Sequence, residues 1–169
     1  MKSGGGKAKG GEFERKICKE LSLWVSQGKH DDLFWRSAMS GGRATVRGKK
    51  GKETASGHGD ITAVTPEGNL LTDFFVIECK SHKSLGFDLH LYGHGPLAEI
   101  WDKLRKECGN DKKPILVLKE NRRSALIGLS FVCPGLVCLA VYWSHLHLYH
   151  LKDVLSLDFT EFKKLSDGA

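Results

Sequence analysis

The 169-residue sequence lacks any apolar run long enough to cross a membrane, and it shows no internal repeat. A membrane-spanning helix needs about 20 predominantly apolar residues. The first residues lead into lysine and glycine instead of the apolar core of a secretory signal. These absences argue against a membrane protein, a secreted protein and a repeat array. We expect a soluble cytoplasmic protein, in a host cytoplasm if its origin is a phage, that makes no membrane contact.

The sequence also lacks a disulfide framework, because its five cysteines are odd in number and show no paired spacing. This pattern favours a reducing compartment. Cys133 and Cys138 are too far apart for a zinc knuckle, although three histidines follow them, at His145, His147 and His150. A zinc site built from these residues is the alternative to our expectation. We expect both cysteines in the core and the histidines alternating with leucines on a half-exposed strand.

Basic residues are in excess, with a formal net charge of +6. This moderate excess suggests that the partner is a polyanion. The positive charges gather in three clusters. The N-terminal tail contains Lys2, Lys7 and Lys9, and a glycine-rich segment contains Arg43, Arg47, Lys49, Lys50 and Lys52. The third cluster consists of Lys119, Arg122 and Arg123.

The length and the hydrophobic fraction of 40% indicate one domain with a real core. Glycines make residues 1–11 a flexible basic tail, which suits a phosphate-contacting arm and a linker equally. Residues 12–169 then form the single domain. Within it, residues 37–59 contain too few apolar residues to pack, and a long basic loop of this kind is usually functional. We expect this loop to order on a nucleic-acid backbone.

The pattern of apolar residues predicts alternating helices and strands. Residues 12–26 show an apolar stripe at helical spacing, with Glu14 at the edge of the buried face and Glu12 on the polar face. A second helix is expected over residues 96–108, between Pro96 and Gly109. Strands are expected over residues 33–36, 60–64, 69–80, 87–91, 114–118, 125–132, 136–143 and 146–151, with 114–118 central in the sheet and 159–169 a short helix or tail.

An apolar run that ends in Glu78-Cys79-Lys80 is the most informative feature. Alternate side chains of a strand face the same way, so Glu78 and Lys80 point together and Cys79 points to the other face. Asp60 joins them if residues 60–64 and 69–80 form a hairpin around the turn at residues 66–69. Two carboxylates and an ammonium group that converge make a site for Mg²⁺ and a phosphate.

Four pieces in order resemble the PD-(D/E)xK nuclease superfamily, and within it the archaeal-type and phage Holliday junction resolvases. The first is Lys-Gly-Gly-Glu-Phe-Glu-Arg at residues 9–15, like that family's Lys-Gly-x-x-x-Glu-Arg opening. Arg-Ser-Ala-Met-Ser-Gly at 36–41, Gly-Asp-Ile at 59–61 and Ile-Glu-Cys-Lys at 77–80 follow. The resemblance covers roughly residues 9–82. Gly59 stands where the superfamily has proline, and the interval from Asp60 to Glu78 is longer than in compact resolvases.

The resemblance implies an α/β fold of the restriction-endonuclease type, with a mixed central β-sheet flanked by helices. It implies catalytic roles for Glu14, Ser40, Asp60, Glu78 and Lys80. Mg²⁺, or Mn²⁺ in its place, would be held by Glu14, Asp60, Glu78 and the Cys79 carbonyl. Arg15 and Arg36 would contact DNA phosphate or brace the acidic cluster. The basic loop residues would also contact DNA: Arg43, Arg47, Lys49, Lys50 and Lys52. Phosphodiester hydrolysis would leave 5′-phosphate and 3′-hydroxyl ends.

The leading hypothesis is therefore a homodimeric, Mg²⁺-dependent endonuclease that cuts four-way or branched DNA in recombination and repair. Residues 136–151 supply apolar and aromatic surface for a dimer interface or, equally, for the core. One alternative is a restriction-like, repair or phage DNA-processing enzyme that cuts linear duplex. Another is a DNA-binding module without catalysis. An HNH-type enzyme is disfavoured because the histidines lack the required asparagine and spacing.

Overall fold

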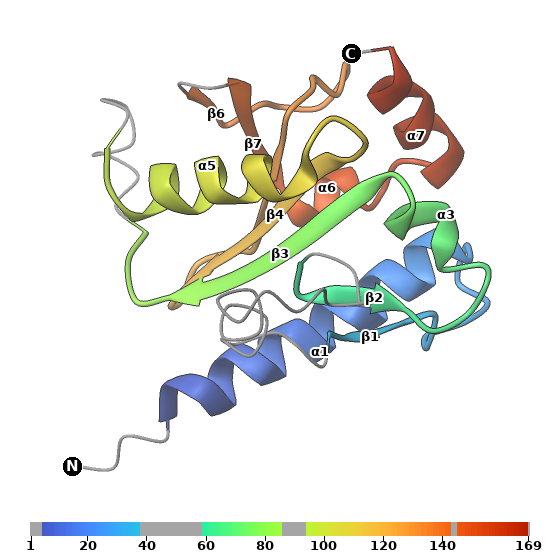
Figure 1. Ribbon diagram of the computed structural model, residues 1–169, viewed down its shortest axis with the longest axis horizontal. Coiled ribbons are helices and arrows are strands. Elements are labelled where there is room, and N and C mark those ends of the chain that lie inside the picture. Colours follow the sequence, from blue (N-terminus) through green and yellow to red (C-terminus); the bar gives the residue numbers. More distant parts are fainter. Residues whose placement is uncertain (1–4, 38–58, 86–93, 143–144, 169) are drawn as a thin grey trace.

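The computed structural model describes residues 5–37, 59–85, 94–142 and 145–168. Its centre is a mixed five-stranded sheet in the order β3-β4-β5-β7-β6, and helices cover both faces (Figure 1). The elements are α1 (Gly5–Val25), β1 (Phe34–Arg36), β2 (Ile61–Ala63), α3 (Asn69–Thr72), β3 (Phe75–His82), α5 (Pro96–Cys108), β4 (Lys113–Glu120), β5 (Leu126–Leu129), β6 (Ala140–Tyr142), β7 (Leu146–His150), α6 (Leu151–Val154) and α7 (Phe159–Asp167). This architecture confirms the predicted restriction-endonuclease-like fold class.

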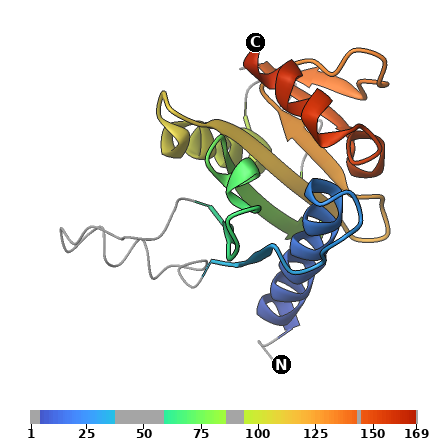
Figure 2. The same ribbon diagram turned by 90° about the vertical axis from the view of Figure 1, so that its right-hand side faces the viewer.

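The sheet has one parallel pair and three antiparallel pairs. β3 pairs with β4 in parallel, and β4–β5, β5–β7 and β7–β6 are antiparallel. β1 and β2 form a separate antiparallel pair that lies beside α1 (Figure 2). Residues 115–118 of β4 are fully buried, which confirms the predicted central strand. Such a strand is covered on both faces, so its residues read as a continuous apolar run.

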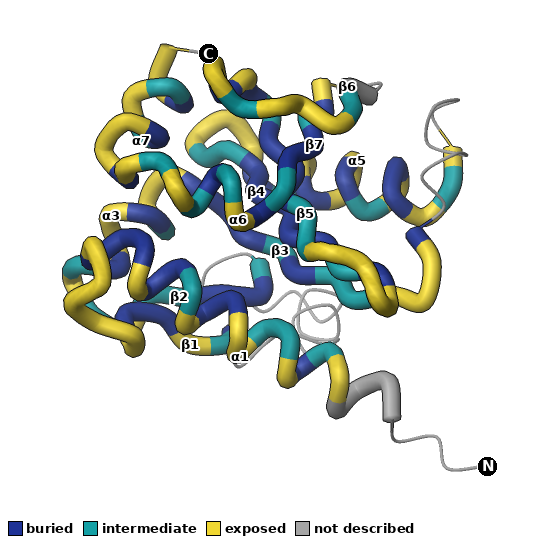
Figure 3. The backbone as a smooth tube through the Cα atoms, turned by 180° about the vertical axis from the view of Figure 1, so that it is seen from behind, coloured by how far each residue is buried: buried dark blue, intermediate teal, exposed yellow. Residues whose placement is uncertain are grey.

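Two apolar clusters hold the layers together, one on each face of the sheet. On one face, Ile17 and Leu21 of α1 pack with Ile77 of β3 and with residues of α6 and α7. On the other face, Trp101 and Leu104 of α5 pack with residues of β3 and β4. Figure 3 shows the buried residues along the edge strand β3 and its inner neighbour β4. Each fully buried large side chain contributes about 1.5–3 kcal/mol.

The predicted hairpin is wrong. β2 pairs with β1 instead of β3, and residues 69–72 form the short helix α3. The chain passes close to Leu33 at Gly68, where a Cβ would lie 2.7 Å from the Leu33 carbonyl oxygen. It then forms α3, which is stabilised by the burial of Leu71 in the core. β3 therefore begins only at Phe75 and takes β4 as its partner.

Helix α1 begins at Gly5, seven residues before the predicted start at Glu12. Residues 5–11, assigned from their glycines to a flexible tail, are therefore helical. Adding residues to an existing helix costs little compared with starting one, so the buried half of α1 can extend through this glycine-rich stretch. The second helix, α5, begins and ends as predicted, with Gly109 at its C-terminal end.

Other expectations are met in part. The strands expected at 125–132 and 136–143 are shorter, and Leu151 begins α6 instead of ending a strand. Cys133 is buried as expected, but Cys138 is exposed, so its predicted place in the core is wrong. The strand expected at residues 87–91 lies outside the described residues. In the described part of the chain, no helix is long and apolar enough to span a membrane.

Candidate active site

Asp60 is held by backbone hydrogen bonds on both sides. Its N–H donates to the Ile77 carbonyl at 2.8 Å, and its carbonyl accepts from the Ser37 N–H at 2.8 Å. It therefore bridges the end of β1 and the middle of β3. The adjacent Gly59 has φ +93°, and a Cβ there would lie 2.6 Å from the Ile77 carbonyl oxygen. Only glycine suits this position, and the fixed negative φ of proline excludes it.

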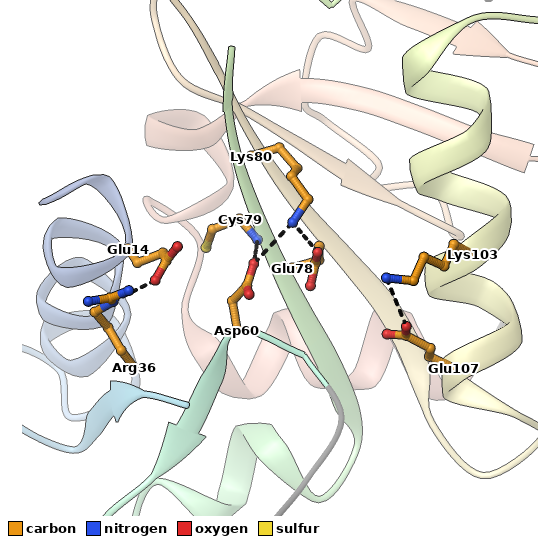
Figure 4. A network of polar contacts seen from close by, with 8 residues as sticks. All are labelled: Glu14, Arg36, Asp60, Glu78, Cys79, Lys80, Lys103 and Glu107. Carbon is orange, nitrogen blue, oxygen red and sulfur yellow. Dashed lines mark hydrogen bonds and ion pairs between the residues drawn. The ribbon is translucent and has the colours of Figure 1, made fainter. Parts of the chain in front are cut away.

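Three charged side chains meet where Asp60 approaches β3 (Figure 4). The Cys79 N–H donates to Asp60 Oδ2 at 3.0 Å, which fixes the carboxylate. Lys80 Nζ lies 3.5 Å from the same oxygen and also donates to Glu78 Oε1. Strand alternation places Glu78 and Lys80 on the α5 face of β3, and buried Cys79 on the α1 face. The predicted meeting of Asp60, Glu78 and Lys80 is thus found without the predicted hairpin.

The electrostatics of this cluster are dominated by burial. Burial, reinforced by the Asp60 carboxylate, raises the pKa of Glu78 to about 7, and Lys80 offsets only part of this rise. Burial acts to lower the pKa of Lys80, but Glu78 and Asp60 outweigh it and raise that pKa. Lys80 is therefore an ammonium group at neutral pH. Burial, followed by the Asp60 charge, raises the pKa of the Cys79 thiol well above its usual range.

Glu14 lies on the opposite side of β3 from Glu78 (Figure 4). Its Oε2 accepts a hydrogen bond from Arg36 Nε at 2.5 Å. The Arg36 guanidinium lies over Gly11, where a Cβ would be 3.0 Å from Nη1. Arg36 therefore braces Glu14, one of the two roles expected for this arginine. Glu14 is half-buried and Glu12 exposed, as the helical pattern predicts.

A cavity of about 250 Å³ opens between β3 and α5, and Glu78 and Lys80 form one wall of it. The opposite wall includes Glu99, Lys103 and Glu107 of α5, and Lys103 Nζ lies 3.4 Å from Glu107 Oε1. The sequence analysis did not assign these residues to the site. Their spacing of four residues along the polar side of α5 is the signal that could have indicated a shared polar face.

The carboxylates of Asp60 and Glu78 suit a divalent cation, because both already converge on one positive group, Lys80 Nζ. Mg²⁺ is commonly bound by one or two carboxylates together with water and phosphate oxygens. Among the residues described, no group of three or more His, Cys, Asp or Glu side chains is close enough to hold a metal. Neither Glu14 nor the zinc alternative therefore forms such a group, and the metal ligands stay a prediction.

The predicted DNA-binding residues are only partly described. Arg15 is exposed on α1, next to Glu14. Ser40 and the basic loop residues Arg43, Arg47, Lys49, Lys50 and Lys52 lie outside the described residues. The segment that contains them leaves the described chain at Ser37 and returns at Gly59, and Ser37 is hydrogen-bonded to Asp60. The described residues that flank this segment, Ser37 and Gly59, therefore lie beside Asp60. Asp60 is part of the acidic cluster that Asp60 and Glu78 form around Lys80.

Comparison with known proteins gives one match. A family model described as "Phage putative PDDEXK endonuclease" matches residues 5–165. No curated protein sequence and no solved structure gives a significant match. The family match confirms the resemblance to the PD-(D/E)xK superfamily. The likeness to Holliday junction resolvases stays a prediction.

Proposed function

The chain belongs to the phage PDDEXK endonuclease family, and from this premise we propose a Mg²⁺-dependent, structure-selective DNA endonuclease. Its substrate would be four-way or branched DNA, cut by phosphodiester hydrolysis. The observation that carries the proposal is the convergence of Asp60, Glu78 and Lys80 at one side of a cavity. Two carboxylates beside an ammonium group suit an enzyme that must both hold a cation and approach a phosphate.

Asp60 and Glu78 would hold Mg²⁺, with the Cys79 carbonyl as the expected further ligand. When bound, Mg²⁺ would supply Lewis-acid chemistry, since such an ion polarises phosphoryl oxygens and lowers the pKa of water. The Cys79 N–H keeps the Asp60 carboxylate oriented. Lys80, charged at neutral pH, donates hydrogen bonds that orient the water or stabilise negative charge on the phosphoryl oxygens. Preorganised donors of this kind need no rearrangement during the reaction.

Glu14 and Arg36 would act from the α1 side of β3. Their pairing at 2.5 Å gives this half-buried carboxylate a cationic partner close to the site. Glu14 would complete the metal site when DNA is bound, and Arg36 would orient it. Arg15 would contact a neighbouring phosphate. Ser40 would act near the scissile phosphate, and the basic residues Arg43, Arg47, Lys49, Lys50 and Lys52 would contact the DNA backbone.

A homodimer is proposed because a four-way junction has two equivalent strands to cut, and a two-fold assembly matches that symmetry. The net charge of +6 supports binding to several DNA arms. Junction selectivity rests on the resolvase-like motifs, and cleavage of linear duplex is the contrary outcome of the test.

The test compares a synthetic four-way junction with linear duplexes of the same sequence, in Mg²⁺, using wild type, Glu78→Gln and Glu12→Gln. The Glu12 variant removes an exposed carboxylate from α1 and is the control. We expect paired cuts in the junction, a loss of at least about a hundredfold for Glu78→Gln, and normal cutting for Glu12→Gln. Equal cutting of both DNAs would refute structure selectivity. Metal-independent binding without cutting would refute the endonuclease.

A further inference from the structure

A second cavity, of about 450 Å³, lies beside Lys80 on the α5 face of the sheet. The pairing of residues across the strands shows where this cavity lies relative to Lys80. Lys80 is paired with Leu118, Leu118 with Leu126, and Leu126 with His150, so these four residues form one row across β3, β4, β5 and β7. Leu118, Leu126 and His150 line the cavity. Because neighbouring strands are about 4.8 Å apart, the floor of the cavity begins one strand from Lys80.

The wall of this cavity contains a paired carboxylate and, among the described residues, one buried polar atom that an apolar ligand would leave unsatisfied. His150 Nδ1 is buried and has no hydrogen-bond partner in the described part of the chain. Glu120 is 9% exposed; its Oε1 accepts from the Leu85 N–H at 2.6 Å and its Oε2 lies 3.2 Å from Arg123 Nε. An unpaired buried nitrogen is costly unless a ligand pairs with it. The wall therefore fits a flat ligand with hydrogen-bonding edges.

The rim of the cavity is cationic. Arg122 and Arg123 come from the turn between β4 and β5 and are both exposed. Arg122 has φ +62°, which is uncommon for a residue other than glycine, and it takes part in no ion pair within the described ranges. Guanidinium groups bind phosphate in a bidentate manner. These are the arginines of the third basic cluster in the sequence, for which the proposed catalytic site has no use.

We propose that this cavity binds one nucleotide of the DNA substrate, next to the phosphodiester that Lys80 faces. Its base lies on Leu126 with an edge toward His150, and its phosphate lies at Arg122 and Arg123. This inference rests on the proposed function and specifies its substrate. A base enters such a cavity only after leaving the helical stack, which costs least where it is unpaired. The cavity therefore selects DNA with an unpaired nucleotide at a branch point or bulge.

The test uses Glu78→Gln protein, so that DNA is bound and not cut. Four-way junctions and bulged duplexes carry 2-aminopurine, in turn, at each position within three nucleotides of the branch or bulge. Two further substitutions are compared in this background. Arg122→Gly removes the charge and suits the positive φ, and His150→Leu replaces the unpaired nitrogen by carbon. Arg105→Ala removes an exposed arginine of α5 outside the cavity and is the matched control.

We expect the 2-aminopurine fluorescence to rise on binding at one position. This rise should be at least about fivefold smaller with Arg122→Gly and with His150→Leu. With Arg105→Ala it should be as large as in the parent. An abasic site at that position should weaken binding by the parent about tenfold and leave the two variants unaffected. His150→Leu should unfold at the same or a higher temperature than its parent. A purely structural histidine would instead lower that temperature and leave the fluorescence intact.

The inference is overturned if DNA binds and no position responds, or if the two cavity variants respond like the parent. Failure of the proposed function is distinct from this. If the fluorescence response is present but wild type cuts none of these DNAs with any divalent metal, the cavity stands and the endonuclease does not. If no DNA binds at all, both are wrong.

Discussion

Glu78 carries a pH-dependent stability that can be measured without DNA. Its pKa is about 7 in the folded protein, raised by burial and by Asp60, against a usual value of 4.5. Between these two values the folded state keeps a proton that the unfolded state has lost, so the folded state binds more protons and stability falls as pH rises. The loss begins above pH 4.5 and is complete above pH 7. Its size is about 3 kcal/mol.

We therefore expect the free energy of unfolding of metal-free protein to fall between pH 5 and pH 8, and Glu78→Gln to flatten this slope. Urea denaturation in a chelator measures both proteins. Added Mg²⁺ should recover stability at pH 8 in the wild type but not in the variant, because a ligand that binds only the folded state stabilises it. Parallel pH profiles for the two proteins would contradict the raised pKa.

Gly59 is the residue on which the position of Asp60 depends. A side chain at this residue meets the Ile77 carbonyl oxygen at 2.6 Å and Val76 Cγ1 at 3.0 Å, in a backbone conformation that already disfavours it. Gly59→Ala should lower stability by about 1–3 kcal/mol and cleavage by more than about tenfold, because a displacement of about 1 Å costs catalysis heavily. Gly59→Pro, which restores the superfamily's proline, should be worse still.

The control for Gly59 is Gly135→Ala. Gly135 also has a positive φ, +84°, but a Cβ there meets nothing within 4 Å. This variant should lose about 1 kcal/mol from backbone strain alone and keep full cleavage activity. If Gly59→Ala and Gly135→Ala behaved alike, the close approach of residue 59 to β3 would not be what holds Asp60 in place.

At the scale of elements, the first turns of α1 can be tested through two neighbouring glycines. A Cβ at Gly10 meets nothing within 4 Å, whereas a Cβ at Gly11 meets the Arg36 guanidinium at 3.0–3.3 Å. Gly10→Ala should therefore stabilise the protein by about 0.5–1 kcal/mol without changing cleavage. Gly11→Ala gains the same helix propensity but displaces Arg36 from Glu14, so it should lower cleavage. A flexible tail over residues 1–11 would make both substitutions silent in urea denaturation.

The helices and strands that the sequence predicted correctly are those marked by a pattern among neighbouring residues. The apolar stripe marked α1, and Pro96 and Gly109 delimited α5, because periodicity and end signals are properties of neighbouring residues. The pairings of β1 with β2 and of β3 with β4 join segments far apart in the chain, and a local turn signal at residues 66–69 suggested a hairpin instead. The row from Lys80 to His150 was hidden for the same reason, since it depends on register across four strands.

The meeting of Asp60, Glu78 and Lys80 was predicted correctly from the sequence, although the predicted strand pairing around it was wrong. Alternation along one strand sufficed to put Glu78 and Lys80 together and Cys79 behind them. Asp60 reaches them through a backbone bond to Ile77 instead of a hairpin. The α5 wall of the cavity, with Lys103 and Glu107, was missed because nothing in a sequence indicates which helix covers which face of a sheet.

At the scale of the whole molecule, the two edges of the five-stranded sheet differ. The acidic cluster lies at the β3 edge, and β6 forms the other edge. Exposed apolar side chains come from the segment that leads into β6, with Val132 54%, Val137 74% and Leu139 43% exposed. Tyr149, from the predicted interface at 136–151, is fully buried and its hydroxyl accepts from the Cys133 N–H, so it belongs to the core. Dimerisation through the β6 edge would leave both proposed catalytic sites open to DNA.

Val137→Asp tests this arrangement, because a charge buried in an apolar interface without a partner is strongly unfavourable. We expect wild type to sediment as a dimer and Val137→Asp as a monomer. The dissociation constant of the dimer should rise at least about tenfold, which corresponds to about 1.4 kcal/mol. The control is Leu70→Asp, which places the same charge on an exposed leucine of α3. On a four-way junction, the monomeric variant should make single nicks where wild type makes paired cuts, since one subunit then acts at a time. Dimerisation by Val137→Asp as strong as that of wild type would place the interface elsewhere.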